Sequence, residues 1–334
     1  MSDSHLQLIE NLVACGQRVR EAVVRAEYHR LAEVVGLGAD GADTTHIDKL
    51  AEDAALAFLE SAEPRMNILS EEVGFLDRGS ALTAIVDPID ATNNAVAVPN
   101  FVPRPDASLA ELAETPLREG HVFGFPYYAF SVGVVEDGQL IAGCVMNLPT
   151  GEVFTAARGH GVDLDGVPVR ARQVTTLREA RVALIRPETD AAWRTLRAIT
   201  VGARRIRVTG CSALDLALIA CGTLEALINP NRISPGGWGE KIVDYAGALA
   251  LLNETGSVLT GFDGVPVPVD FDLSRRTPLV AAATPELHDV LIEALHAESW
   301  DDVARDEGGG QGRSSNEDRT PPPCHPEPQK DLSS

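Results

Sequence analysis

The amino-terminal part of the chain repeats apolar positions with the period of an α-helix. Apolar side chains recur three or four residues apart from about Ser4 to Val35, and this spacing predicts one long helix or two. A second helix is expected to begin near Thr45 and to end at Pro64, because proline cannot continue a helix. Its predicted buried positions are Ile47, Leu50, Ala54 and Phe58.

Short β-rich runs replace the helical period after residue 66. They cover residues 67–70, residues 82–86 and most of residues 129–156. The pairs Asp137-Gly138 and Thr150-Gly151 are typical of tight hairpin turns. The first half of the chain is therefore predicted to be helices packed on an antiparallel sheet.

From residue 181 onward, apolar runs alternate with stretches of helical period, which predicts a smaller, layered α/β lobe. Strands are expected at 181–185, 205–208, 224–228, 257–260 and 279–283, and helices at 190–201, 212–221, 243–252 and 286–296. We expect three parts, which are a lobe of residues 1–180, a lobe of residues 181–298 and a tail of residues 299–334. The tail is acidic and proline-rich, and this composition predicts disorder.

The composition limits the functions that the chain can have. Hydrophobic residues make up 44% of the 334 positions, enough for a core that is mostly aliphatic, because aromatic residues contribute only 5%. Lys and Arg number 28 against 49 Asp and Glu, and the net charge of −21 disfavours nucleic-acid or anionic membrane partners. We expect no signal peptide and no transmembrane helix. The five cysteines form no C-x-x-C pair, so we expect reduced thiols in a cytoplasm.

Acidic residues stand where several predicted strands and helices begin or end. They are Asp48, the pair Glu71-Glu72, Asp87 with Asp90, and Asp244. If these carboxylates converge, mutual repulsion raises their pKa values unless a divalent cation neutralises them. An oxygen-only set favours Mg²⁺ or Mn²⁺ over zinc. Each residue taken singly is typical of a solvated loop, a turn or a helix cap, so the prediction depends on their combination.

The segment D-P-I-D-A-T at residues 87–92 joins two of these carboxylates to the start of a helix. Pro88 restricts the backbone, so that Asp87 and Asp90 can face one point. The N–H groups of Ala91 and Thr92 then form an anion site. Two carboxylates for metal beside N–H groups for phosphate are what metal-assisted phosphate hydrolysis needs.

These motifs resemble those of the inositol monophosphatase superfamily, which also holds fructose-1,6-bisphosphatases and 3′-nucleotidases. The family motif Asp-Pro-x-Asp-Gly-Thr-x-Asn resembles residues 87–94, its Glu-Glu motif resembles residues 71–72, and its Thr-x-x-Asp motif resembles residues 45–48. Its later motifs resemble residues 159–166, 207–216, 244–248 and 254–256. The resemblance covers about residues 5–298 and implies a layered α-β-α-β-α sandwich.

The resemblance also implies roles for individual residues. Two or three Mg²⁺ ions, or Mn²⁺ in their place, would be bound by Glu71, Asp87, the Ile89 carbonyl, Asp90 and Asp244. Asp48 and Thr92 would orient the attacking water, and Glu71 would help to activate it through a bound metal. The substrate would contact Asp90, Ala91, Thr92, Gly210, Cys211, Ser212 and Asn229. The family's usual assembly is a homodimer.

The chain departs from the family pattern at several positions. Ala91 stands where the family has glycine, so we expect that this backbone does not need a positive φ. Val243 replaces the usual tryptophan, with Trp238 displaced upstream. Residues 103–124 resemble an insertion, which is either a lid beside the substrate or a tolerated surface loop. Lys241 is expected to be a solvated surface charge, with a contact to the substrate phosphate as the alternative.

We predict a Mg²⁺-dependent phosphomonoesterase that acts on a small polyol, sugar or nucleoside phosphate. The altered positions leave inositol 1-phosphate as one candidate beside fructose 1,6-bisphosphate, histidinol phosphate, a nucleotide 3′-phosphate and a dedicated biosynthetic intermediate. One alternative is a catalytically inactive metal- or phosphate-binding protein on the same fold. Another is an acidic Ca²⁺-binding module, for which the sequence offers no Asp-x-Asp-x-Asp-Gly loop.

Overall fold

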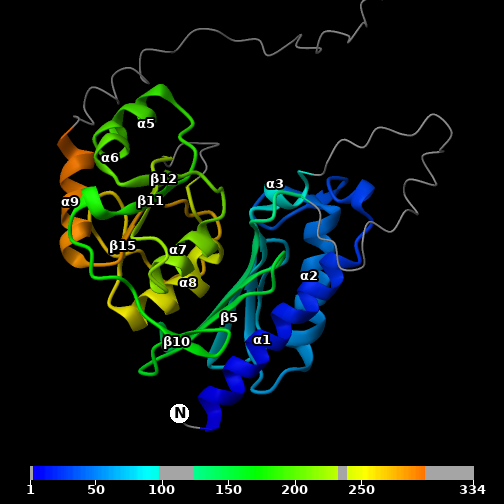
Figure 1. The fold of residues 1–334 in the computed structure, drawn as a ribbon. Coiled ribbons are helices and arrows are strands. Elements are labelled where there is room, and N and C mark those ends of the chain that lie inside the picture. The colour runs from blue at the N-terminus through cyan, green and yellow to red at the C-terminus, as the bar shows by residue number, and fades with distance from the viewer. Residues whose placement is uncertain (1–2, 98–123, 232–238, 298–334) are drawn as a thin grey trace, which may run out of the picture. The chain divides into compact units, whose positions relative to one another are not determined.

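Two long helices cover one face of a large sheet in the computed structural model, which describes residues 3–97, 124–231 and 239–297. The helices α1 (Asp3–Val24) and α2 (His46–Ser61) pack against each other and against the sheet (Figure 1). Leu12, Val19 and Leu59 are completely buried in this layer. Burying a large aliphatic side chain contributes about 1.5–3 kcal/mol, so this stripe fixes both helices to the sheet.

Some sequence predictions lie outside the described residues. They concern the insertion up to residue 123, Trp238 and the tail. The chain divides into the units Met1–Glu298 and Ser299–Ser334. The finer division of the first unit at residue 180 stays a prediction.

The large sheet has eight strands in the order β10-β9-β8-β7-β6-β5-β3-β4. They are β3 (Asn67–Ser70), β4 (Gly74–Leu76), β5 (Leu82–Asp90), β6 (Ala129–Glu136), β7 (Gln139–Asn147), β8 (Val153–Ala157), β9 (Val162–Leu164) and β10 (Val167–Val169). Neighbouring strands are antiparallel, except that β3 and β5 are parallel. Alternate side chains enter two different cores, so both faces of the central strands are apolar.

The helices α7 (Ser212–Ala220) and α8 (Ile242–Thr255) form the layer on the other face of this sheet. The backbone of α8 touches the sheet directly. A Cβ atom on Gly247 would lie 2.6 Å from Ser131 Oγ in β6, and one on Gly133 would lie 2.7 Å from the Ala246 carbonyl oxygen. Glycine at both positions permits this close approach, which brings the first turn of α8 near β5.

A five-stranded sheet covers the far side of α7 and α8, in the order β12-β11-β13-β15-β14. Its strands are β11 (Arg181–Leu184), β12 (Arg205–Arg207), β13 (Ala226–Asn229), β14 (Val258–Thr260) and β15 (Leu279–Ala282). β11, β12 and β13 are parallel, so their carboxyl ends lie at one edge. The outer helices are α5 (Asp190–Thr195), α6 (Arg197–Gly202) and α9 (Pro285–Ala297).

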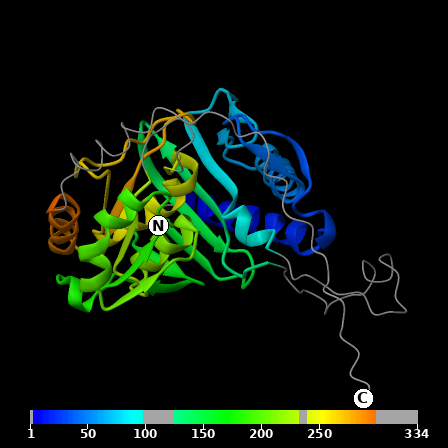
Figure 2. The ribbon, with the colours of Figure 1, turned by 90° about the horizontal axis from the view of Figure 1, so that it is seen from above.

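Helices and sheets therefore alternate in five layers, and the predicted α-β-α-β-α sandwich is confirmed. Figure 1 shows the layers from α1 and α2 across to α9, and Figure 2 shows the same layers from above. The connections include two short 3₁₀ helices, η1 (Tyr28–Arg30) and η2 (Leu177–Glu179). Across the described ranges, no helix has both the length and the apolar composition that a membrane span requires.

The helical prediction up to Val35 was wrong in its last third. α1 ends at Val24, and a two-stranded sheet follows, formed by β1 (Val34–Leu37) and β2 (Asp43–Thr45). The β-branched pair at residues 34–35 and the glycines that follow favour a hairpin over a helix. The predicted helix at 190–201 is likewise two short helices, α5 and α6.

The buried face of α2 also differs from the prediction. Ile47 is buried as expected, but Leu50, Ala54 and Phe58 are only half-buried. The fully buried stripe includes the acidic residues Asp48 and Glu52 in their place. Hydrophobic periodicity misses such a face, because the helix buries carboxylates; Asp48 belongs to the site described next, and Glu52 Oε2 accepts a hydrogen bond from Ser70 Oγ at 2.6 Å.

Candidate metal and phosphate site

A bulge at the end of β5 sets the direction of two aspartates. Asp87 pairs with Ser131 and Asp90 with Ala129, so β5 has one residue more than β6 between these two pairs. In a regular strand, side chains three positions apart point to opposite faces. The extra residue shifts this alternation. Both carboxylates consequently lie close enough for Asp90 to affect the pKa of Asp87.

Three carboxylates from three different elements converge beside this bulge. One oxygen each of Glu71, Asp87 and Asp244 lies within 4.8 Å of the other two. Glu71 follows β3, Asp87 is in β5, and Asp244 is in the first turn of α8. The Lys241 N–H holds Asp244 by donating to its Oδ2 at 2.6 Å. We call these three residues the carboxylate cluster.

The pKa values of the three residues in the carboxylate cluster are all shifted upward. Burial is the main cause, and it raises the pKa of Glu71 to about 7 and that of Asp244 to about 8. Burial, then repulsion from Glu71, Asp90 and Asp244, places the pKa of Asp87 well above its usual range. The deprotonated cluster therefore needs positive charge. Its oxygen-only ligands fit a hard divalent cation such as Mg²⁺ or Mn²⁺.

Asp90 connects β5 to the start of α7. Its Oδ2 accepts hydrogen bonds from the Ala213 N–H at 2.6 Å and from the Cys211 thiol at 3.1 Å. Burial, followed by repulsion from Asp244, raises the pKa of Asp90 to about 7. Asp90 is thus an N-terminal partner of α7 and also a neighbour of the carboxylate cluster.

Three residues predicted to contact the substrate have buried side chains that bind other protein groups. Cys211, Ser212 and Asn229 are at most 2% exposed. The thiol of Cys211 binds Asp90, whereas Ser212 Oγ and Asn229 Nδ2 donate to Glu240 Oε1 at 2.5 and 2.8 Å. Their side chains therefore support the site from behind. Gly210, which directly precedes Cys211, is exposed and has a positive φ of 79°.

Asp48 and Thr92 are brought together as a hydrogen-bonded pair. Thr92 Oγ1 donates to Asp48 Oδ1 at 2.7 Å. The other oxygen of Asp48 accepts from the Thr45 N–H at 2.9 Å and from the Thr45 hydroxyl at 2.7 Å, which caps α2. The same hydroxyl also lies 3.3 Å from the Ile89 carbonyl oxygen. Because its only proton is directed to these acceptors, and most closely to Asp48, the Thr92 oxygen has lone pairs free to accept a hydrogen bond from another group.

The backbone of Ala91 contradicts the prediction that no positive φ is needed. Its φ is 70° and its ψ is 49°, in the left-handed region, at the turn from β5 into α3 (Thr92–Ala95). The left-handed conformation costs a residue with a Cβ about 1–2 kcal/mol. The turn from strand to helix requires this conformation whichever residue occupies it.

Replacing Ala91 with glycine is therefore expected to stabilise the protein. Release of about 1–2 kcal/mol of strain exceeds the entropic cost of glycine, about 0.5–1 kcal/mol, so unfolding should need about 0.5–1 kcal/mol more. Urea unfolding measures the difference. Ala51 is a matched control, because it is buried within α2, where the same change should cost about 1 kcal/mol. A loss of stability in Ala91→Gly would contradict the claim that the left-handed backbone at Ala91 is strained.

Lys241 is not the solvated surface charge that was predicted. It is 8% exposed, and its ammonium contacts Glu71 Oε1 and lies 2.8 Å from Asp40 Oδ2. Arg276 also binds Asp40 Oδ2, at 3.2 Å. Sequence analysis missed Asp40, because the two cations that bind it lie more than 200 positions further along the chain.

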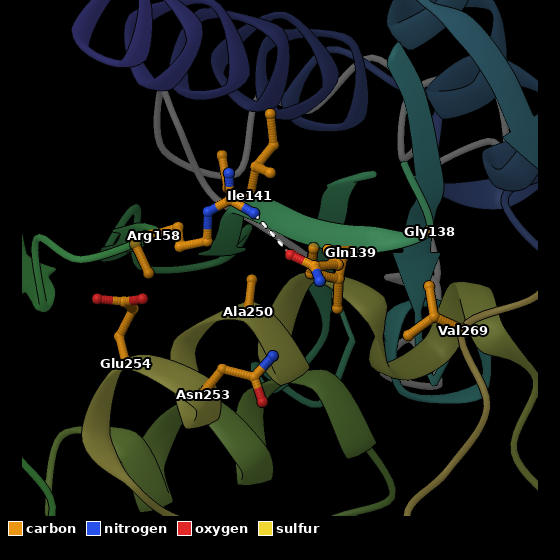
Figure 3. A pocket seen from close by; sticks show the side chains of 11 residues that line it. Gly138, Gln139, Ile141, Arg158, Ala250, Asn253, Glu254 and Val269 are labelled. Atoms are coloured by element: carbon orange, nitrogen blue, oxygen red, sulfur yellow. Dashed lines mark hydrogen bonds between the residues drawn. The ribbon is translucent and has the colours of Figure 1, made fainter. Parts of the chain in front are cut away.

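A separate pocket of about 400 Å³ lies between the β6–β7 hairpin, β8 and the second half of α8, as Figure 3 shows. Arg158 Nη1 donates to Gln139 Oε1 at 2.8 Å on its wall. Glu254, on the same wall, accepts three backbone N–H groups of the turn at residues 159–161, at 2.9–3.0 Å. None of the predicted site residues lines this pocket. We assign Glu254 to holding that turn.

Comparison with known proteins places this fold and site in one family. The model of the inositol monophosphatase family matches residues 7–299. A fructose-1,6-bisphosphatase/inositol-1-monophosphatase of Methanothermobacter thermautotrophicus is 29% identical over 79% of this chain and 87% of its own length. An inositol monophosphatase 1 of Solanum lycopersicum is 28% identical over 83% of this chain and 91% of its own.

Solved structures agree on the fold. The extragenic suppressor protein suhB from Bartonella henselae superposes with a TM-score of 0.67 at 22% identity, over 87% of this chain and 99% of its own. The family match spans both sheets and every segment that contributes to the carboxylate cluster. This chain therefore belongs to the inositol monophosphatase family.

Proposed function

We propose that this protein is a Mg²⁺-dependent phosphomonoesterase that acts on a small polyol, sugar or nucleoside phosphate. The convergence of Glu71, Asp87 and Asp244 carries this proposal, because three adjacent carboxylates with raised pKa values make a site for divalent cations. Bound Mg²⁺ lowers the pKa of water and neutralises charge on a phosphate. Asp90 and the Ile89 carbonyl complete the proposed ligand set.

The protein's own groups have separate tasks in this proposal. The Thr92 oxygen accepts a hydrogen bond from the attacking water, because its proton is committed to Asp48. Asp48 is fixed by the Thr45 cap, so the pair is held in one orientation. The first N–H groups of a helix lack partners within the helix, and those of Ala91 and Thr92 are assigned to the phosphate oxygens.

The substrate, the assembly and the location belong to the proposal as well. Fructose 1,6-bisphosphate and inositol 1-phosphate are the first substrates to test, because the relatives include a fructose-1,6-bisphosphatase/inositol-1-monophosphatase and an inositol monophosphatase. We propose a homodimer in the cytoplasm. The four cysteines among the described residues are free thiols, which agrees with a reducing compartment.

Phosphate release from a panel of small monoesters tests the activity. With Mg²⁺ we expect release from at least one member, and with EDTA we expect none. Thr92→Val is the matched variant, because it removes the hydroxyl and keeps the volume. It should lower kcat by about 10²–10⁴-fold and leave Mg²⁺ binding, measured by calorimetry, unchanged.

A different result would favour the second candidate function. If the protein binds Mg²⁺ but releases phosphate from no monoester in the panel, the site binds metal or phosphate without hydrolysis. That outcome would contradict the proposed activity. The contact between Asp48 and Thr92 favours the enzyme, since a site that only binds metal has no need of a polarised hydroxyl.

A further inference from the structure

A buried lysine lies inside the acidic site. Lys241 precedes α8, and its ammonium contacts Glu71, a member of the carboxylate cluster. Burial raises the pKa values of Glu71 and Asp244, and the charge of Lys241 opposes both shifts. The protein therefore places a permanent positive charge where its carboxylates need neutralising.

Asp40 is a second anion for the same ammonium. It lies in the turn between β1 and β2, and its carboxylate is 1% exposed. Lys241 Nζ is 2.8 Å from its Oδ2, Arg276 Nη2 is 3.2 Å from the same atom, and the Ala42 N–H donates to Oδ1 at 2.8 Å. The Ala39 N–H also donates to the Glu72 carbonyl oxygen at 3.0 Å, so this turn is attached next to Glu71.

Lys241 consequently divides its charge between a carboxylate of the cluster and one outside it. When Asp40 attracts the ammonium, Glu71 is more negative and more available to a cation. When the ammonium turns fully to Glu71, that carboxylate is neutralised by the protein itself. Arg276 holds Asp40 in place and offsets part of its charge, which limits how strongly Asp40 competes.

We propose that Lys241 is a built-in counter-cation of the metal site, which weakens the binding of divalent ions or reduces their number, and that Asp40 sets how much of its charge reaches Glu71. This inference rests on the metal site of the proposed function, but not on phosphatase activity. Its physical basis is Coulombic, since a fixed positive charge within a few ångströms repels a divalent cation and already satisfies one of its ligands. Lys241 is thus a positioning residue for Glu71.

Titration of the full-length protein with MgCl₂ and MnCl₂, without phosphate in the buffer, tests Lys241 as a counter-cation of the metal site. Calorimetry gives affinities, and the spin resonance of free Mn²⁺ counts bound ions. Lys241→Met should lower the Kd for Mg²⁺ at least about tenfold or add one bound ion per chain. Asp40→Asn should raise the Kd about threefold or more, because the ammonium then belongs to Glu71 alone. The two variants thus have opposite expected signs.

A control separates this role from general destabilisation. Arg181 forms a partly buried ion pair with Glu225 at 2.6 Å, away from the carboxylate cluster. Arg181→Met should lower the melting temperature without changing either metal measurement. If Lys241→Met binds Mg²⁺ as the parent protein does, or more weakly, the proposal is overturned. If Lys241→Met fails to fold, unchanged Mg²⁺ binding in Asp40→Asn overturns it. If the parent protein binds no Mg²⁺, the proposed function itself fails.

Discussion

Replacing Asp87 with asparagine should reduce phosphate release at least about a thousandfold and, at the same time, stabilise the metal-free protein. Metal ions contribute several kcal/mol to stabilising the charge of a phosphoryl transition state. Each loss of about 1.4 kcal/mol is a tenfold loss in rate. Asp87 is 3% exposed and belongs to the carboxylate cluster, so an amide there would remove one of the proposed metal ligands.

The gain in stability has the same origin as the loss of activity. Burial and three neighbouring carboxylates raise the pKa of Asp87, so its charge at neutral pH opposes folding. Asparagine keeps the hydrogen bond from the Ile89 N–H, which Asp87 Oδ1 accepts at 3.0 Å, and it carries no charge. We expect the free energy of unfolding in EDTA to rise, because the amide stays neutral at every pH.

Glu225 provides the matched control for this variant. Its side chain is fully buried, but Arg172 and Arg181 neutralise it, and its pKa is lowered: burial opposes the shift, while the Arg181 hydrogen bonds favour it. Glu225→Gln should therefore lose stability, by about 1–3 kcal/mol, because charged hydrogen bonds are lost while the two arginines stay partly solvated, and it should leave phosphate release unchanged. For both variants, urea unfolding in EDTA measures the free energy of unfolding, and a phosphate assay in Mg²⁺ measures phosphate release. The argument fails if Asp87→Asn is destabilised like Glu225→Gln.

The stability of the metal-free protein should fall as the pH rises from 5 to 8.5. A carboxyl group whose pKa is raised on folding binds its proton more tightly in the folded state, so its stabilising effect is complete near pH 4 and is lost as the pH passes the folded value. Burial puts the folded values of Glu71 and Asp90 at about 7 and that of Asp244 at about 8. Because these groups interact, we expect a combined loss of at least about 2 kcal/mol.

Mg²⁺ should reverse this dependence for the groups that it binds. Metal requires deprotonated carboxylates, so the stabilisation by Mg²⁺ should be larger at pH 8 than at pH 5.5, and binding should release protons. Burial also raises the pKa values of Glu52 and Asp215 to about 7. These two groups lie outside the carboxylate cluster, so part of the loss should persist in saturating Mg²⁺. Urea unfolding at three pH values, with EDTA or Mg²⁺, decides the matter, and a flat profile in EDTA would rule out the raised pKa values.

The layers of the fold were predictable because each strand and helix has its own local pattern. The run at residues 279–283 is apolar and short, and its first four residues form a strand in the structure. The sequence was misleading where the buried face of an element is polar, as for α2 with Asp48 and Glu52. There the usual signal is absent, because the helix buries two carboxylates, of which Asp48 binds Thr92 and Glu52 binds Ser70.

The candidate site was predictable only as far as its motifs are local. Asp87 and Asp90 lie in one segment, and the bulge that directs them is short-range. The pairing of Lys241 with Asp40 joins residues 201 positions apart, and neither residue has a motif that specifies the other. The conformation of Ala91 was misjudged for a related reason, because we inferred it from the side chain, whereas the turn between β5 and α3 imposes it.

The contact between α8 and the large sheet has a consequence for how this protein can evolve. A side chain gained at Gly133 or Gly247 would push α8 away from β6 and would move Asp244 with it. Such a substitution leaves every chemical group of the site intact, but it separates Asp244 from Glu71 and Asp87. Selection for activity in a mutant library should therefore purge changes at these two glycines about as strictly as at the carboxylates. If no active variant carries a substitution at Gly133 or Gly247, these two glycines contribute to activity only by having no side chain.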